Sequence, residues 1–221
     1  MATRRRKRRR RLNPRFLALC LALAFILAGT ALWLTRDRGP EAEDVPVPEY
    51  VEKDYLTVNP YSRPGEPLEK INGVVIHYVG NPSTTAHANR NYFESLSSGL
   101  ENTYASSHFI VGLEGEVIQC VPLTEIAYAS NTRNGDTVSI EVCHPDETGE
   151  FSPVTYDRTV ELTAWLCREF RLDPSQDVIR HYDVTGKECP RYYVEHPEAW
   201  DAFRADVASE MKRQNEAEKN S

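Results

Sequence analysis

The run Gly73-Val-Val-Ile-His-Tyr-Val79 has the composition of a buried β-strand. Three consecutive β-branched residues favour extended backbone, and a short apolar run of this length is typical of a strand inside a sheet. The loop sequence Gly80-Asn-Pro-Ser83 follows it directly. His77 interrupts the apolar run close to this loop, so it is the first candidate for a functional side chain.

Strand and helix patterns alternate along the rest of the chain. Apolar residues recur at helical spacing in some segments, and short β-branched runs separate these segments. This alternation predicts a single α/β domain with a mixed central β-sheet and helices on both faces. The expected elements are a helix over residues 86–97 capped by Thr85, a hairpin of strands 107–111 and 116–121, a strand over 138–143, and helices over 155–170 and 197–211.

The N-terminal region has the pattern of a membrane-targeting segment. Residues 1–15 carry nine basic side chains and no acidic one, and residues 16–35 are twenty residues without a charge. A helix of about 20 apolar residues spans the hydrocarbon core of a bilayer, and a basic flank favours the cytoplasmic side. We therefore expect a basic cytoplasmic segment over 1–15 and a transmembrane signal-anchor over 16–35. A cleavable signal peptide is the alternative.

The remaining sequence predicts one exported domain. Residues 36–53 are acidic and contain three prolines, as expected of an extended linker. The domain is expected over residues 54–208, followed by a polar, flexible tail over 209–221. The expected location is a bacterial cell membrane crossed once, with the domain outside the cytoplasm, or secretion after signal cleavage.

The charge distribution excludes nucleic acid as a partner. The chain has 26 basic and 33 acidic residues, and the nine basic side chains of residues 1–15 leave a net charge of −16 on the rest. A domain with this charge repels the phosphate backbone. The sequence does not predict an oligomeric state.

A second group of polar side chains occurs in His181-Tyr-Asp-Val-Thr-Gly-Lys-Glu-Cys189-Pro. An imidazole and a thiol eight residues apart on a loop can converge on one metal ion, and His77 is the best candidate for a third ligand. Two histidines and one thiolate leave a fourth tetrahedral position open. That arrangement is typical of catalytic rather than structural zinc sites.

The other histidines and cysteines have weaker patterns. His108 precedes an apolar strand, and we expect it to be structural or to contact a metal ligand without binding the metal itself. Three cysteines lie inside strand or helix patterns, where a cysteine is usually a small buried apolar residue; they are Cys120, Cys143 and Cys167. We expect the remaining histidines to be solvated or to have capping roles; they are His87, His144 and His196.

Four segments together resemble one known family. They are VVIHYVGNP (74–82), SHFIVGLEGEVIQCVP (107–122), SIEVC (139–143) and HYDVTGKECP (181–190). Their sequences and order are similar to those of the zinc-dependent N-acetylmuramoyl-L-alanine amidases, a family that includes phage lysozyme-type amidases and peptidoglycan recognition proteins. The resemblance covers residues 55–199, nearly the whole predicted domain.

The resemblance implies roles for particular residues. One zinc ion would be held by His77, His181 and Cys189, the same three residues that the spacing suggests. Lys187 would point at the site, where its ammonium can stabilise an oxyanion. Asp183 would orient a ligand without touching the metal. Tyr128 and Asn131 are expected to line the cleft.

One position departs from the phage members of the family. They carry a tyrosine before the His-Phe pair of the first hairpin strand, whereas this chain has Ser107 there. Other bacterial members use a glutamate in an Ile-Glu strand segment, and Glu141 matches it. A carboxylate beside the metal is a suitable general base, so we expect Glu141 to be catalytic; the alternative is an ordinary strand glutamate that faces solvent.

The expected function is hydrolysis of peptidoglycan at the amide bond between N-acetylmuramic acid and L-alanine. A membrane contact through the N-terminal helix is the second expected interaction. Three alternatives stay open: a non-catalytic peptidoglycan receptor on the same fold, a structural protein of the envelope, and a zinc peptidase that cuts within the stem peptide. Receptors of this family generally lack the cysteine ligand, and Cys189 is present here.

Overall fold

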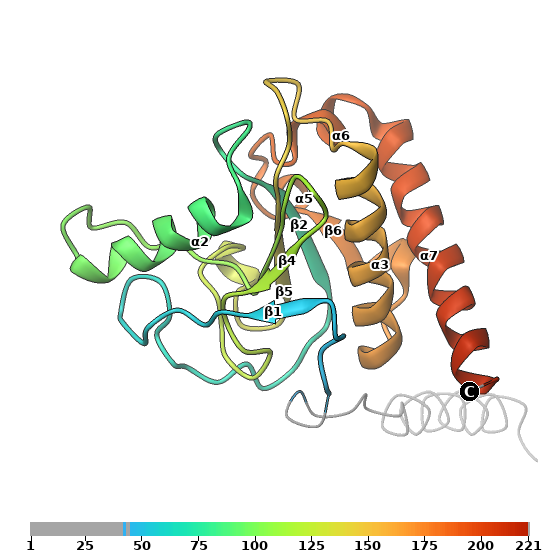
Figure 1. Cartoon of the computed structure of the whole chain (residues 1–221), viewed down its shortest axis with the longest axis horizontal. Helices are drawn as coiled ribbons and strands as arrows, with labels where there is room; N and C mark the ends of the chain where they lie inside the picture. The colour runs from blue at the N-terminus through green and yellow to red at the C-terminus, as the bar shows by residue number, and fades with distance from the viewer. Residues whose placement is uncertain (1–41, 43–44, 221) are drawn as a thin grey trace, which may run out of the picture. The chain divides into compact units, whose positions relative to one another are not determined.

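The computed structural model describes residues 42 and 45–220, and all of them fall in one compact unit (Figure 1). A six-stranded sheet lies at its centre, in the order β1-β4-β3-β5-β2-β6. The strands are β1 (Val51–Lys53), β2 (Val74–Tyr78), β3 (Phe109–Val111), β4 (Val117–Gln119), β5 (Val138–Val142) and β6 (Val178–Arg180).

The sheet is mixed, as the sequence predicts. β3 and β4 form the only antiparallel pair among these strands, whereas β2 runs parallel to both β5 and β6. In the pairing of β2 with β5, His77 lies opposite Glu141. Since paired residues point to the same face of a sheet, this register places the two side chains next to each other.

Helices cover both faces of the sheet, which confirms this part of the fold prediction. On one face, α2 (Ala86–Ser95) and the 3₁₀ turn η2 (Leu96–Ser98) pack against β3 and β4. On the other face, α3 (Pro153–Phe170) and α7 (Pro197–Lys219) lie side by side (Figure 1). The short helices α4 (Pro174–Asp177), α5 (His181–Thr185) and α6 (Arg191–Glu195) connect the last strands and helices.

The alternation of side chains along each strand creates two separate cores. The α3/α7 face carries the larger core, with Val74 and Ile76 of β2 and Ile140 of β5. The α2 face carries the smaller core, which includes Ile110 and Ile118. The polar side chains of β2 and β5 point to the α2 face, because they alternate with the residues of the larger core.

Several boundaries differ from the predicted ones because of their capping residues. The predicted cap of α2 is present, since the Thr85 hydroxyl accepts a hydrogen bond from the Ala88 amide. α3 begins earlier than predicted because Ser152 caps it and Pro153 occupies its first turn, a position that suits proline. α7 continues to Lys219, further than the helix predicted over 197–211 and into the segment predicted as a flexible tail. β1 lies at the end of the segment predicted as a linker.

The predicted membrane-spanning helix needs correction. None of the helices in the part of the chain that the structure describes is long and apolar enough to cross a bilayer. Its two long helices, α3 and α7, carry charged residues along their solvent side, whereas a spanning helix is apolar all round. Residues 1–15 and 16–35 lie outside the described residues. The membrane helix in the predicted fold, and the membrane contact inferred from it, are therefore not supported.

Candidate metal centre

The candidate site lies at the carboxyl end of three parallel strands. His77 is the fourth of the five residues of β2, and Glu141 is the fourth of the five in β5. His181 directly follows the last residue of β6 and opens α5. Parallel strands end at the same edge of the sheet, so residues far apart in the sequence meet there.

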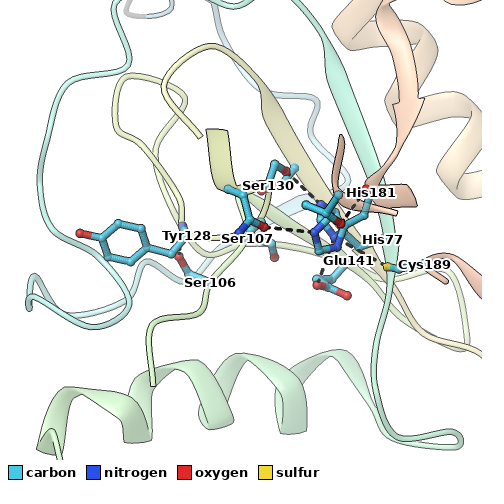
Figure 2. A network of polar contacts seen from close by, with 12 residues as sticks. His77, Ser106, Ser107, Tyr128, Ser130, Glu141, His181 and Cys189 are labelled. Carbon is cyan, nitrogen blue, oxygen red and sulfur yellow. Dashed lines mark hydrogen bonds and ion pairs between the residues drawn. The ribbon is translucent and has the colours of Figure 1, made fainter. Parts of the chain in front are cut away.

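The structure brings His77, His181 and Cys189 together. One ligand atom from each of the three side chains lies within 4.8 Å of the others. The Cys189 Sγ is 3.9 Å from the His77 Nδ1, and the two imidazole ring centroids are 4.6 Å apart. Figure 2 shows these side chains pointing toward one another, with Glu141 beside them.

The loop between His181 and Cys189 turns back on itself. Gly186 follows the last residue of α5 as its C-cap, and its φ of +77° lies in the left-handed region that glycine adopts without strain. The chain then returns to the start of the helix, where the Tyr182 amide donates a hydrogen bond to the Cys189 carbonyl at 2.9 Å. This return places the thiol beside the ring of His181, which explains why the two ligands are eight residues apart.

Glu141 lies against the cluster. Its Oε1 is 3.9 Å from the His77 Nδ1, and its Oε2 is buried without a hydrogen-bond partner. Burial raises the pKa of Glu141 to about 8, and the nearby Lys187 ammonium opposes that shift. A carboxyl group in this environment is neutral at pH 7 unless a further positive charge stabilises its ionised form.

Burial also shifts the three candidate ligands toward their uncharged forms. Burial, with the positive charges of His181 and Lys187, holds the pKa of His77 well below its usual value. Burial and Lys187 lower the pKa of His181 as well. Burial raises the pKa of the Cys189 thiol to about 12, with Glu141 adding to the shift. Both imidazoles therefore keep the lone pair that a metal needs.

Two adjacent residues contact the Nε2 atoms of the two histidines. The Ser130 hydroxyl is 3.1 Å from the His77 Nε2, and the Asn131 Oδ1 is 3.3 Å from the His181 Nε2. Asn131 was expected only to line the cleft, and Ser130 was not predicted. Nothing local marks Ser130, because its contact joins residues 53 positions apart in the sequence.

Asp183 and Lys187 differ in their relation to the site. Both carboxylate oxygens of Asp183 accept hydrogen bonds from Arg180, which caps the start of α5. Asp183 therefore stabilises the first turn of α5, the helix that begins at His181. Its predicted role in orienting a metal ligand stays a prediction. The positive charge of Lys187 lowers the pKa values of His77, His181 and Glu141, and its predicted role toward an oxyanion stays a prediction.

The remaining residues of interest point elsewhere. Ser107 precedes β3, and its buried hydroxyl donates to the Phe109 carbonyl at 2.9 Å. His108 accepts a hydrogen bond from the Ser139 amide at its Nδ1, and its Nε2 donates to the Glu125 carbonyl at 2.9 Å, as expected of a structural histidine. The Tyr128 ring points away from the candidate ligands (Figure 2).

The candidate ligands fit zinc. Two imidazoles and one thiolate are the nitrogen and sulfur donors that zinc prefers over the oxygen ligands of magnesium or calcium. Two of the five buried side-chain polar atoms without a partner in the described part of the chain are here, the His181 Nδ1 and the Glu141 Oε2. A bound cation would give the His181 Nδ1 a partner and a charge to the environment of Glu141.

A second cluster of possible ligands does not have these features. Glu52, Asp54 and His87 also bring one ligand atom each within 4.8 Å, but they lie at the surface and offer mainly carboxylate oxygens. Exposed acidic groups of this kind are common without an ion.

A comparison with protein families supports the resemblance found in the sequence. Residues 67–192 match the family model described as N-acetylmuramoyl-L-alanine amidase. This range covers more than half of the chain and includes all the candidate ligands.

Two similar proteins carry the same description. The N-acetylmuramoyl-L-alanine amidase BlyA of Bacillus subtilis (strain 168) is 32% identical over 177 residues, which are 71% of this chain and 46% of that protein. The N-acetylmuramoyl-L-alanine amidase CwlL of Bacillus licheniformis is 30% identical over 171 residues, 72% of this chain and 47% of that protein. The chain thus spans about half the length of these two relatives.

Solved structures share the fold. The catalytic domain of XlyA superposes with a TM-score of 0.60 at 25% identity, over 71% of this chain and 98% of that domain. The PlyG catalytic domain has the same TM-score at 22% identity, over 73% of this chain and 94% of that domain.

Proposed function

The chain belongs to the N-acetylmuramoyl-L-alanine amidase family, and from this premise we propose that its domain hydrolyses peptidoglycan in a zinc-dependent reaction. The bond cut is the amide between the lactyl group of N-acetylmuramic acid and the first L-alanine of the stem peptide. We also propose that the domain acts outside the cytoplasm, because intact peptidoglycan lies there.

The main support for this proposal is the group of buried side chains at the carboxyl end of β2, β5 and β6. His77, His181 and Cys189 supply three donors for one ion, and the unpartnered oxygen of Glu141 lies beside them. A protein that used this fold only to bind peptidoglycan would not need a buried carboxyl group without a hydrogen-bond partner, since such a group destabilises the folded state.

The chemistry divides among the residues of the site. A zinc ion held by the two histidines and the cysteine would supply Lewis-acid polarisation and would stabilise the ionised form of Glu141. Glu141 then accepts a proton from the attacking water, which adds to the lactyl carbonyl carbon. The ammonium of Lys187 stabilises the negative charge that develops on the carbonyl oxygen.

The second half of the reaction uses the same carboxyl group. Glu141 returns its proton to the alanine nitrogen as the carbon–nitrogen bond breaks. The products are a lactyl carboxylate on the sugar and a stem peptide with a free amino group. One water is consumed, and the enzyme returns to its starting protonation state.

Full-length protein incubated with purified peptidoglycan tests this proposal. Mass spectrometry should detect free stem peptides that begin with alanine. A chelator should abolish them, and added zinc should restore them. In the Cys189→Ala variant, activity and zinc affinity should both fall. The loss should exceed the about 10–100-fold that follows removal of a residue that only hydrogen-bonds to a metal ligand.

The matched control is the Cys167→Ala variant. Cys167 is also a buried cysteine, but it lies in α3 within the larger core. Its replacement should cost about 1 kcal/mol of stability and leave the zinc content unchanged. Peptidoglycan that is bound but not cut by zinc-loaded protein would reject the amidase and favour the receptor. Products cut within the stem peptide would instead indicate a zinc peptidase.

A further inference from the structure

Adjacent residues of a single loop contact both candidate histidine ligands at equivalent atoms. The Ser130 hydroxyl lies against the Nε2 of His77 (Figure 2). The Asn131 Oδ1 lies against the Nε2 of His181. The other ring nitrogen of His77, Nδ1, is 3.9 Å from the Cys189 Sγ. That of His181 is buried without a partner.

The contact of Asn131 selects one tautomer of His181. A side-chain amide oxygen only accepts hydrogen bonds, so the Nε2 of His181 must carry the proton that is donated to the Asn131 Oδ1. A neutral imidazole has one protonated nitrogen, and therefore Nδ1 keeps its lone pair. The buried, unpartnered atom of His181 is thus the one that can bind a metal.

The same reasoning applies to His77 through two contacts. The thiol of Cys189 can donate to the His77 Nδ1, and the Ser130 hydroxyl can accept from the His77 Nε2. Both contacts favour the tautomer protonated at Nε2. Ser130 is only 1% exposed, so water does not compete for this hydrogen bond.

The loop that carries the two residues is itself held in place. The Asn134 Oδ1 accepts hydrogen bonds from the backbone amides of Ala129 and Ser130, at 3.1 and 2.6 Å. Upstream, the Ser106 hydroxyl accepts from the Tyr128 amide at 2.9 Å. Asn131 has a φ of +49°, which asparagine tolerates better than most residues and which turns its side chain toward His181.

We propose that Ser130 and Asn131 are positioning residues that fix the tautomer and ring orientation of His77 and His181, so that both present Nδ1 to one zinc ion. The proposal rests on the proposed function only for the identity of the ion. Such outer partners orient histidine ligands and raise their affinity for metal. Two adjacent residues therefore position two ligands from different elements, His77 of β2 and His181 of α5.

Three variants and one control separate positioning from packing. Ser130→Ala removes the hydroxyl at His77. Asn131→Gly removes the amide at His181 but keeps the positive φ, whereas Asn131→Asp keeps an acceptor oxygen. Ser107→Ala is the matched control, because the buried Ser107 hydroxyl donates to the backbone carbonyl of Phe109 and contacts neither histidine ligand.

Two measurements on the full-length protein need no peptidoglycan. Zinc affinity is measured by competition with a chromogenic chelator, and ¹⁵N spectra of labelled histidine rings report the tautomers in metal-free protein. We expect Ser130→Ala and Asn131→Gly to lower zinc affinity about 10–100-fold and to mix the tautomers of His77 and His181, respectively. Asn131→Asp and Ser107→Ala should keep the wild-type affinity and the Nε2-protonated rings.

The result that overturns the proposal is equally specific. Wild-type affinity and unchanged tautomers in both Ser130→Ala and Asn131→Gly would remove it, as would an equal loss of affinity in Ser107→Ala. If Ser130→Ala does not fold, the comparison of Asn131→Gly with Asn131→Asp tests the proposal by itself, because Asn131 is exposed. Absence of amidase activity in the wild-type protein, together with the expected zinc affinities and tautomers, would reject the proposed function and leave this proposal standing.

Discussion

The two faces of the sheet use the same strands for different purposes. On the α3/α7 face, the inward residues of β2 and β5 are all apolar; they are Val74, Ile76, Val138, Ile140 and Val142. On the α2 face, the alternate positions of the same strands carry His77, Ser139 and Glu141. One face therefore supplies hydrophobic stabilisation, and the other holds the polar groups of the site.

The α2 face itself contains two kinds of buried polar group. His108 and Ser139 bond to each other and to backbone groups, so both nitrogens of the His108 ring are satisfied. The Glu141 Oε2 and the His181 Nδ1 have no partner. An unpaired buried polar group costs free energy, so it is retained where a ligand or a reaction uses it.

This contrast indicates which substitutions should change stability and which should change activity. Because the larger core lies across the sheet from the site, changes there should affect unfolding without affecting the chemistry. Changes among the unpartnered groups should do the reverse. Three substitutions test this separation.

The largest expected effect is on Glu141. Glu141→Gln keeps the shape of the side chain but removes its ability to accept and return a proton, so activity on peptidoglycan should fall about 10²–10⁴-fold. Zinc content and melting temperature should stay at the wild-type level, because the residue binds no other side chain through its Oε2. Product release, metal content and thermal unfolding measure the three quantities.

An exposed glutamate provides the comparison for this variant. Glu114 lies in the turn between β3 and β4, and Glu114→Gln should leave the activity unchanged. Full activity in a folded, zinc-loaded Glu141→Gln protein would reject the general-base role and leave the site without its proposed proton acceptor.

The next effect is on the opposite face. Leu166 of α3 is fully buried in the larger core, and Leu166→Ala should lower the free energy of unfolding by about 2–5 kcal/mol through lost burial and a cavity. Zinc affinity and activity of the folded protein should not change. Urea unfolding measures the stability, and a parallel loss of zinc affinity would show that the two faces are coupled.

The smallest effect is on the pH dependence of stability. Burial lowers the pKa of His108 to about 4, whereas an unfolded histidine has a pKa near 6.5. The unfolded state therefore binds a proton first as the pH falls, and stability present above pH 6.5 decreases down to pH 4. At pH 5 the loss from His108 should be about 2 kcal/mol.

The variant His108→Gln isolates this contribution. Its stability at pH 7 should be lower, since the hydrogen bonds to Ser139 and Glu125 change. Its decline between pH 6.5 and 4 should be shallower than that of the wild-type protein, measured by urea unfolding at equal zinc concentration. Equal slopes for the two proteins would mean that His108 does not titrate in this range.

The long elements of the fold were predictable because their patterns are local. The apolar run at β2, the cap at Thr85 and the helical spacing of α3 are all visible within a few residues. β1 and β6 were not predicted, since strands of three residues are too short to show alternation. The length of α7 was underestimated because its last turns are polar, and polarity alone does not distinguish a solvated helix from a tail.

The candidate site was predictable in its residue types but not in its supports. A histidine at the end of a buried strand and a His-to-Cys loop both indicate metal binding from the sequence, and the structure brings those side chains together. Ser130 carries no such signal, because serine in a loop is ordinary. Asp183 was predicted to orient a metal ligand. In the structure its carboxylate accepts a hydrogen bond from Arg180, three residues away.

The strand pattern, the family resemblance and the three residues proposed to bind zinc could all be inferred from the sequence alone. These depend on residue type and on spacing within short segments. The contacts of Ser130 and Asn131 with the Nε2 atoms of the two histidines depend on the folded chain. Those contacts join residues 50 and 53 positions apart, where the order of the strands in the sheet, rather than any local preference, brings them together.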